Sequence, residues 1–325
     1  MHPVITALLV AGLALATAAC KPAGASSGTD GGAVLKIGSQ KGSTRALLEA
    51  SGVLQGAPYR IQWSEFGAAS PLLEAIGDGA VDIGGVGDAP FVFAYAAGAP
   101  VQAIFAYRTG TQLASSTALI VPEASPVRSV EDLRGRKVAT VRGSVGHYLL
   151  IRLLQTHGID PKAVQTVFLD PGSSRGALSS GRVDAWSTWS PYVGYGLLHD
   201  HDRKIGDGAG LMSGIAFMAA NRRSIETKAS ALQDFDRRLV RAYAWGRSHQ
   251  DVYAQRISTE TGLPLDVAKD MARRLTATPA PMDEALQTEE RQTLTAFAKG
   301  GVIAAPPDLK NAFAVQFNPA IRATL

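Results

Sequence analysis

The stretch "IGSQKGSTRALLEASGVL", residues 37–54, decides how this chain is expected to fold. Apolar residues typical of a strand precede it, a turn rich in glycine and serine follows, and apolar residues then recur at helical spacing: Ala46, Leu47, Ala50 and Leu54. The first N–H groups of a helix have no acceptor within it, and the helix dipole places positive potential there. The stretch therefore predicts a strand, a tight turn and a helix N-terminus that favours a bound anion.

A second stretch of the same construction, "RKVATVRGSVGHYLLIRLL", occupies residues 136–154. In it Gly143 and Ser144 correspond to Gly42 and Ser43 of the first stretch. Further identities follow in the same order along the chain: Phe66 with Phe168, Ala75 with Ala177, Gly79 with Gly181, Val81 with Val183, and Asp82 with Asp184. Ordered matches across three turns predict an internal repeat.

The repeat predicts two α/β lobes, because each half alternates strands and helices as parallel sheets do. We expect the first lobe over residues 34–120, the second over 121–213, and a return to the first lobe over 214–325, where the pattern becomes helical. Two extended segments, Ser116–Pro126 and Ser213–Ile225, are expected to connect the lobes and form a hinge. Ligands bind beyond the carboxyl ends of strands in such sheets, so the turns of both lobes should face one cleft.

Residues 1–33 are expected to lie outside the fold as a signal peptide and linker. The uncharged apolar run from Val4 to Ala19 has the length of a signal-peptide core and is short for a membrane span. Cys20, the only cysteine, follows it and resembles the lipidated cysteine of bacterial lipoproteins, although Thr17 and His2 depart from that pattern. A plain secreted protein and an uncleaved anchor are the alternatives. All three place the folded part in the periplasm or at the cell surface.

Composition and charge exclude several classes of function. The 325 residues are 46% apolar, which is ample for real cores, and the net charge of +4 comes from dispersed lysines and arginines. No basic run with interleaved aromatics is present, so nucleic-acid binding is not expected.

The residues expected at the turns do not form a catalytic or metal-binding set. The "HDHD" segment, residues 199–202, is flanked by Leu198, Arg203 and Lys204 and is expected to be a solvated loop rather than a metal site. Ser144 and His147 could form a nucleophile and base, but no acid is placed to orient the imidazole, and a capping serine is the ordinary role. Lys41 precedes the second glycine of "GSQKGS", so this is not a nucleotide-binding loop. We expect no enzyme activity, no cofactor and no metal.

What remains is recognition of an anion. Ser43 and Ser144 suit helix N-caps, and Gln40 has no capping role, so it is expected to donate to a ligand oxygen. Trp189 replaces a turn glycine and is expected to project into the cleft, whereas Trp186 can belong to core or site.

Three aspartates at the turns are expected to have structural roles. Asp82 and Asp184 are expected to hold turns or caps in the two lobes. Asp88 is awkward beside an anion and is expected to cap the helix that contains Pro90, with Arg108 or Arg142 as its charge partner.

Four motifs resemble the periplasmic substrate-binding proteins of ABC importers for aliphatic sulfonates, close to the taurine and nitrate binders. They are "KIGSQKGSTRALLEASGVL", "EAIGDGAVDIGGVGDAP", "ATVRGSVGHYLLIRLL" and "SGRVDAWSTWSPY", and they occur in order between Val34 and about Tyr253. The resemblance implies a type II periplasmic-binding-protein fold, with two lobes that close around a small organic anion. It also implies a monomer that delivers this ligand to an ABC permease in the inner membrane.

The resemblance also implies which residues hold the ligand. Trp189 would contact the alkyl chain of the ligand. Three groups of residues would bind the sulfonate: Gln40, Gly42 and Ser43; Gly87, Asp88 and Ala89; and Gly143, Ser144 and Val145. Ser190 and Ser39 depart from the family pattern, where aspartate and an aromatic are common, and this leaves the organic part of the ligand open. Taurine, sulfate esters, nitrate and pyrimidine-type solutes are the alternatives, and an enzyme resembling thiamine-pyrimidine synthases is the alternative of another class.

Overall fold

The first sheet contains the first strand of the repeat and also two strands from the C-terminal part of the chain. The computed structural model describes residues 33–41, 44–109, 114–274 and 277–319. Within these residues the sheet has six strands: β1 (Ala33–Gln40), β2 (Tyr59–Phe66), β3 (Ile83–Gly87), β4 (Val101–Arg108), β10 (Ile215–Asn221) and β11 (Thr278–Ala280). Their order across the sheet is β11-β4-β10-β3-β1-β2.

The first sheet is mixed, which corrects the expectation of parallel strands alone. Strand β1 pairs in parallel with β2 and β3, but β10 lies antiparallel to both β3 and β4. The reason is topological: the chain returns from the second lobe at the carboxyl ends of β3 and β4, so a strand that starts there must run the opposite way. All seven residues of β10 are buried.

The second sheet repeats the plan of the first. Its described strands are β5 (Ala118–Val121), β6 (Lys137–Thr140), β7 (Gln165–Phe168), β8 (Ala185–Thr188) and β9 (Arg203–Asp207), in the order β7-β6-β8-β5-β9. Strand β6 is parallel to β7 and β8, and β5 is antiparallel to β8. The first strand after each crossover therefore takes the same position in its sheet. The whole of β5 pairs in the second sheet, so the change of lobe precedes the expected boundary at residue 120.

Two equivalent aspartates show the repeat at atomic detail. An Oδ2 atom of Asp82 accepts from the backbone N–H of Lys36 at 2.8 Å, and Asp184 accepts from the N–H of Lys137 in the same way at 2.8 Å. Asp82 also accepts from Lys228 Nζ at 2.6 Å. Both aspartates directly precede strands, and their role is structural, as the sequence indicated.

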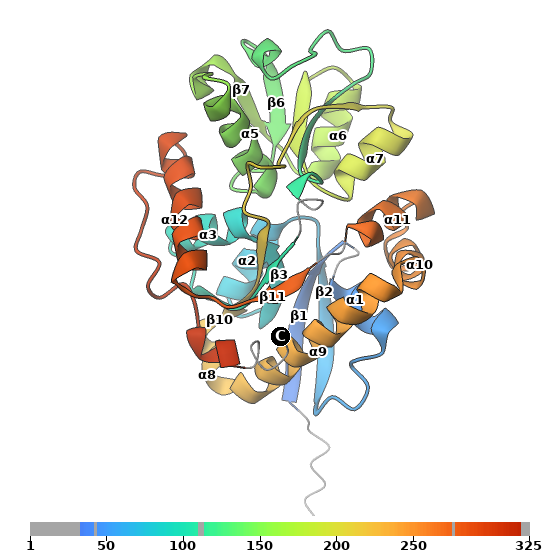
Figure 1. The fold of residues 1–325 in the computed structure, drawn as a ribbon, viewed down its shortest axis with the longest axis vertical. Coiled ribbons are helices and arrows are strands. Elements are labelled where there is room, and N and C mark those ends of the chain that lie inside the picture. Colours follow the sequence, from blue (N-terminus) through green and yellow to red (C-terminus); the bar gives the residue numbers. More distant parts are fainter. Residues whose placement is uncertain (1–32, 42–43, 110–113, 275–276, 320–325) are drawn as a thin grey trace, which may run out of the picture. The chain divides into compact units, whose positions relative to one another are not determined.

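Helices cover both faces of the first sheet (Figure 1). One face packs against α1 (Thr44–Ser51), α9 (Ala229–Ser248), α10 (Gln250–Thr261) and α11 (Leu265–Arg273). The other packs against α2 (Ala69–Gly77), α3 (Asp88–Ala96) and α12 (Glu284–Lys299), while α8 (Arg222–Thr227) follows β10. Leu35 and Ile37 of β1 are fully buried against the first group.

The second sheet is likewise covered on both faces. Helix α5 (Val145–Thr156) buries Leu149, Leu150, Leu153 and Leu154 against one face. Helices α6 (Pro171–Ser179) and α7 (Tyr192–His199) cover the other, where Trp186 of β8 is 1% exposed and belongs to the core. Short 3-10 turns complete the fold: η1 (Glu131–Leu133), η2 (Pro161–Ala163) and η3 (Val315–Phe317).

Contacts between the lobes hold the cleft together. Helix α12 packs against both α3 and α5, where its Phe297 lies in one cluster with Ala89 and Tyr148. On the other side of the cleft, the Tyr192 hydroxyl donates to the Gly67 carbonyl at 3.0 Å. None of the described helices is both long enough and apolar enough to cross a membrane.

Candidate ligand-binding site

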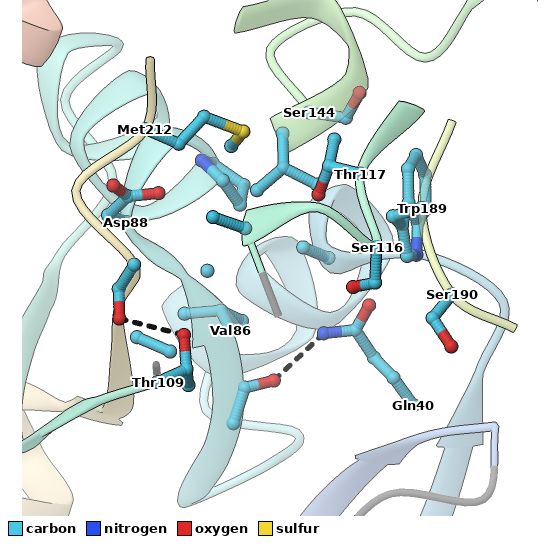
Figure 2. Close-up of a pocket in the computed structure, with 18 of the residues that line it drawn as sticks. Gln40, Val86, Asp88, Thr109, Ser116, Thr117, Ser144, Trp189, Ser190 and Met212 are labelled. Atoms are coloured by element: carbon cyan, nitrogen blue, oxygen red, sulfur yellow. Dashed lines mark hydrogen bonds between the residues drawn. The ribbon is translucent and has the colours of Figure 1, made fainter. Parts of the chain in front are cut away.

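A cavity of about 230 Å³ lies between the two lobes (Figure 2). Its walls come from the ends of β1 and β3, the starts of α1, α3 and α5, both crossovers, and the segment between β8 and α7. This is the position expected for a ligand of two open α/β sheets. Both polar side chains and aromatic rings line the cavity. The lining residues include Gln40, Lys41, Thr44, Asp88, Tyr107, Thr109, Ser116, Thr117, Ser144, Val145, Trp189, Ser190, Tyr192, Met212 and Tyr243.

The structure brings most of the described candidate residues to this cavity. Gln40, Gly87, Asp88, Ser144, Val145 and Trp189 line it. Ala89 and Gly143 do not, because their atoms are directed into the packing between the lobes. Gly42, Ser43 and the candidate lipidation residue Cys20 lie outside the described residues.

The N-terminus of α5 lies at the cavity wall, where Ser144 and Val145 line it. Ser144 is the N-cap, and its Oγ accepts from the His147 N–H at 3.1 Å. The N–H groups of Val145 and Gly146 lie in the first turn, where the helix itself offers no acceptor. Val145 lines the cavity. An anion at this point would be stabilised by these donors and by the helix dipole.

Gly143 has a supporting role rather than a lining one. Its φ of +70° lies in the left-handed region, and a Cβ atom there would come within 2.2 Å of Phe93. The Gly143 N–H donates to His147 Nδ1 at 3.1 Å, so it is used inside the protein. Glycine is required here because it lets the turn before α5 pack against α3.

His147 is a neutral structural residue. Burial lowers the pKa of its imidazole to about 4, and the positive charge of Arg142 acts in the same direction. Since Nδ1 accepts from Gly143 and the Ser144 hydroxyl accepts from the His147 backbone, these two side chains are not arranged as a nucleophile and base. The expectation of a capping serine is confirmed.

Asp88 is fully buried at the start of α3 and is held by neutral donors. The expected capping role is wrong, because Gly87 is the N-cap and no side chain caps this helix. Asp88 is the first residue of the helix, and its carboxylate accepts from the Ala89 N–H at 2.6 Å and from the Ser213 hydroxyl. The expected partner Arg108 is wrong, since that guanidinium binds Glu289 at 2.5 and 3.0 Å. Burial raises the pKa of the Asp88 carboxyl, although both hydrogen bonds act to lower it.

The other proposed partner of Asp88, Arg142, also lies elsewhere: its guanidinium covers the ring of Phe168 at 3.9 Å.

Gln40 connects two strands at the edge of the cavity. Its Nε2 donates to the Gly85 carbonyl at 2.8 Å, which ties the end of β1 to β3 (Figure 2). The side chain therefore has a structural bond that the sequence did not indicate. Its position on the lining still fits an additional contact to a ligand.

Trp189 forms an aromatic wall on the side of the second lobe. Its ring meets Tyr192 edge to face, with centroids 5.7 Å apart, and both rings line the cavity. Such a wall buries apolar ligand atoms. The expectation that Trp189 projects into the cleft agrees with the geometry.

The crossovers contribute residues that sequence reasoning missed. Thr109 and Gly214 connect the two crossovers, because the Thr109 hydroxyl and N–H both donate to the Gly214 carbonyl, at 2.8 and 2.6 Å. Ser116 and Thr117 line the cavity just before β5. Ser116, Thr117 and Gly214 lie in the segments expected to form the hinge, so that expectation was the available signal for them, whereas Thr109 lies outside both segments.

The lining offers little for catalysis. Asp88 and Lys41 are the acidic and basic side chains among the described lining residues, and Lys41 is exposed. No group of three histidine, cysteine or acidic side chains among the described residues could hold a metal ion. His199 of the "HDHD" segment instead lies 3.0 Å from Asp266.

Comparisons with known proteins agree with this geometry. Residues 65–251 match the family model described as NMT1/THI5 like. The chain is 33% identical over 282 residues to an aliphatic sulfonates-binding protein of Escherichia coli (strain K12), covering 85% of this chain and 87% of that protein. The alkanesulfonate-binding protein SsuA from Xanthomonas axonopodis pv. citri, solved bound to MOPS, superposes with a TM-score of 0.79 at 28% identity, covering 86% of this chain and 98% of that one.

The fold also occurs in an enzyme. The desulfurization enzyme DSZB superposes with a TM-score of 0.65 at 18% identity, covering 90% of each chain or more, and this likeness shows the fold alone. The family match and the relative in E. coli are more specific. The chain therefore belongs to the NMT1/THI5-like periplasmic binding proteins, with the type II periplasmic-binding-protein fold, and is a substrate-binding protein of ABC import in the sulfonate- and taurine-binding family.

Proposed function

We propose that this protein captures aliphatic sulfonates between its two lobes for sulfur acquisition and delivers them to an ABC permease in the inner membrane. The observation that carries the proposal is the cavity itself, which combines the N-terminus of α5 with the aromatic wall of Trp189 and Tyr192. Backbone donors suit a sulfonate head, and the aromatic wall suits an alkyl chain. The names of the relatives point to the same ligand class.

In this proposal the candidate residues divide between the two ends of the ligand. Gln40, Ser144 and Val145 contact the sulfonate together with Gly42 and Ser43, while Trp189 contacts the organic part. Gly87, Asp88 and Ala89 shape the start of α3 beside the head group, and Gly143 supports the turn before α5. No formal cation is required, since hydrogen bonds to a charged group contribute about 1.5–3 kcal/mol each.

Isothermal titration calorimetry against a panel of solutes tests the proposal. We expect linear alkanesulfonates to bind with micromolar dissociation constants, and each added methylene to improve the constant roughly fourfold while it is buried. Trp189→Ala should reduce this increment, whereas Trp245→Ala, outside the cavity, should not. Binding of taurine, a sulfate ester, nitrate or a pyrimidine, with no alkanesulfonate bound at millimolar concentration, would contradict the ligand class.

We also propose that the protein is a monomer held at the periplasmic face of the membrane through a lipid on Cys20. Labelling of cells with a radioactive fatty acid should mark the protein, and Cys20→Ala should abolish the label. Steady turnover of any bound solute would argue instead for an enzyme on this fold.

A further inference from the structure

One histidine–aspartate pair joins the two lobes at the end of α7. His199 Nε2 lies 3.0 Å from Asp266 Oδ1. Helix α7, which ends at His199, covers the second sheet, whereas α11, which contains Asp266, covers the first. The two helices pack against each other, and a Cβ atom at Gly194 would meet Val267 at 3.6 Å. The pair therefore lies where the lobes are already in contact.

The two helix ends favour opposite charges on this pair. His199 is in the last turn of α7, and Asp266 is in the first turn of α11. A cation is stabilised at a helix C-terminus and an anion at an N-terminus, so both dipoles favour a protonated His199 and an ionised Asp266. The hydrogen bond with His199 is the largest of the effects that lower the pKa of Asp266. The Tyr195 ring packs beside the imidazole, with centroids 4.9 Å apart.

Most other charged groups around α7 are engaged in pairs of their own. These pairs are Arg175 with Asp200, Lys204 with Asp207, and Arg274 with Asp270, and the remaining groups are His201, Asp202 and Arg203 in the second lobe and Lys269 and Arg273 in α11. Burial, together with the charge of Asp200, raises the pKa of Asp202 to about 6. Asp202 can therefore titrate in the same range as a histidine, and a test of His199 has to separate the two.

We propose that His199 and Asp266 form a proton-dependent clasp: protonation of His199 strengthens the contact between the lobes, favours the closed state and so strengthens ligand binding. The inference rests on the proposed function for its probe, a sulfonate held between the lobes. A ligand that contacts both lobes binds the closed state, so its apparent affinity rises with the closed fraction. Histidine side chains change charge near pH 6.5 when nothing perturbs them. The clasp should therefore be strong at pH 5.5 and weak at pH 8.

Isothermal titration calorimetry with propane-1-sulfonate at pH 5.5 and pH 8 measures the effect. The sulfonate does not titrate in this range, so a change in affinity comes from the protein. We expect the ratio of the dissociation constants, pH 8 over pH 5.5, to be roughly two- to fivefold larger in the wild-type protein than in His199→Gln. Asp88 and Asp202 are present in both proteins, so their titration does not produce this difference. Equal ratios would overturn the inference.

His157 supplies a matched control within one lobe. It lies 2.6 Å from Glu131, and the exposed fractions of these two side chains, 33% and 56%, match the 34% and 56% of His199 and Asp266. Both partners belong to the second lobe, so His157→Gln should leave the ratio at its wild-type value. An equal fall in both histidine variants would contradict a clasp across the cleft.

A permanent positive charge tests the direction of the effect. Lysine stays charged at pH 8, so His199→Lys should bind the sulfonate roughly two- to fivefold more tightly than the wild-type protein at that pH. The gain should disappear when Asp266→Asn is added. Affinity at or below the wild-type value at pH 8, in a variant with wild-type thermal stability, would contradict the inference.

The unliganded protein separates this inference from the proposed function. Small-angle X-ray scattering should give a smaller radius of gyration at pH 5.5 than at pH 8, and His199→Gln should lose this difference. If the difference appeared but no sulfonate bound, the proposed function alone would fail. If sulfonates bound with the same pH ratio in the wild-type protein and in His199→Gln, the clasp alone would fail.

Discussion

The Asp88 carboxylate and the Ser213 hydroxyl, 125 positions apart in the chain, form a hydrogen bond that fastens the start of α3 to the second crossover. Ser213 Oγ also accepts from the Ile215 N–H at 3.1 Å, so one side chain organises the entry to β10. We expect Ser213→Ala to lower the free energy of unfolding by about 1–3 kcal/mol, because it leaves one oxygen of a buried carboxyl without its donor. Urea titration measures this, and Ser179→Ala, at an exposed serine of α6, should change the value little. Equal stability of the two variants would contradict the role of Ser213.

Gly143→Ala should be more damaging than Gly158→Ala. Both glycines have positive φ, but a Cβ at Gly143 meets Phe93 at 2.2 Å and one at Gly158 meets nothing within 4 Å. The expected loss in free energy of unfolding is about 2–4 kcal/mol at Gly143 and about 1–2 kcal/mol at Gly158. Thermal or chemical unfolding of both variants measures these losses. Equal losses would mean that the contact of the added Cβ with Phe93 does not contribute to the destabilisation.

His147 should lower the stability of the protein at acidic pH. With a pKa near 4 in the fold and 6.5 when unfolded, the unfolded chain binds the extra proton between these values. The free energy of unfolding should therefore fall by on the order of 3 kcal/mol as the pH drops from 6.5 to 4. His147→Gln retains an acceptor for Gly143 without titrating, and it should flatten this part of the profile. An NMR titration of His147 near pH 6.5 would contradict the prediction.

Two aspartates of α9 should respond to pH in opposite directions. Asp236 is 2% exposed, neither of its oxygens has a partner, and burial raises its pKa well above the ordinary value. Burial also acts to raise the pKa of Asp234, but hydrogen bonds from Arg238 at 2.5 Å and Tyr59 at 3.0 Å outweigh it, and that pKa is lowered.

The folded protein holds a proton on Asp236 that the unfolded chain releases above about pH 4, so this residue makes stability fall as the pH rises. Asp236→Asn should remove that fall. Asp234→Asn should instead cost about 1–3 kcal/mol at neutral pH and less in acid. If the free energy of unfolding depended on pH in the same way in both variants, the opposite pKa shifts of Asp234 and Asp236 would be contradicted.

Gln40→Ala should weaken both ligand binding and the free protein. The sequence alone suggested a loss of binding only, but the bond to Gly85 adds a loss of about 0.5–1.5 kcal/mol in the free energy of unfolding. Sulfonate affinity should fall roughly tenfold or more if the amide also contacts the head group. Gln62→Ala, at an exposed position of β2, is the control for both measurements. Unchanged affinity with reduced stability would restrict Gln40 to its structural role.

Much of the fold was predictable because the sequence contains an internal repeat, and each half encodes a similar lobe. The match of Gly143 and Ser144 with Gly42 and Ser43 predicted the second lobe. Local pattern did not predict the direction of β10 or the pairing of β4 and β11 beside it. Those features depend on where the chain re-enters the first sheet after the second lobe, and this cannot be predicted from a short stretch of residues.

The site was predictable where a residue type implied its role. Ser144 could be recognised as a cap, and Trp189 stood out because it replaced a glycine. The hydrogen bond of Thr109 to Gly214 and the partner of Asp88 could not be predicted, since each joins segments more than a hundred positions apart. The missed lining residues Ser116 and Thr117 belong to a crossover whose course depends on both sheets.

Strand β10 has a consequence for the order in which the molecule can form. It inserts between β3 and β4 with every residue buried, while all five described strands of the second sheet lie between Ala118 and Asp207. During synthesis the second lobe is complete before Ile215 emerges, whereas β3 and β4 must wait for a partner more than a hundred residues away. Until then they present bare edges that invite pairing with other chains. The first lobe is thus the first to be synthesised and the last to complete its sheet. The nascent chain is most prone to aggregate after β4 has been synthesised and before β10 has.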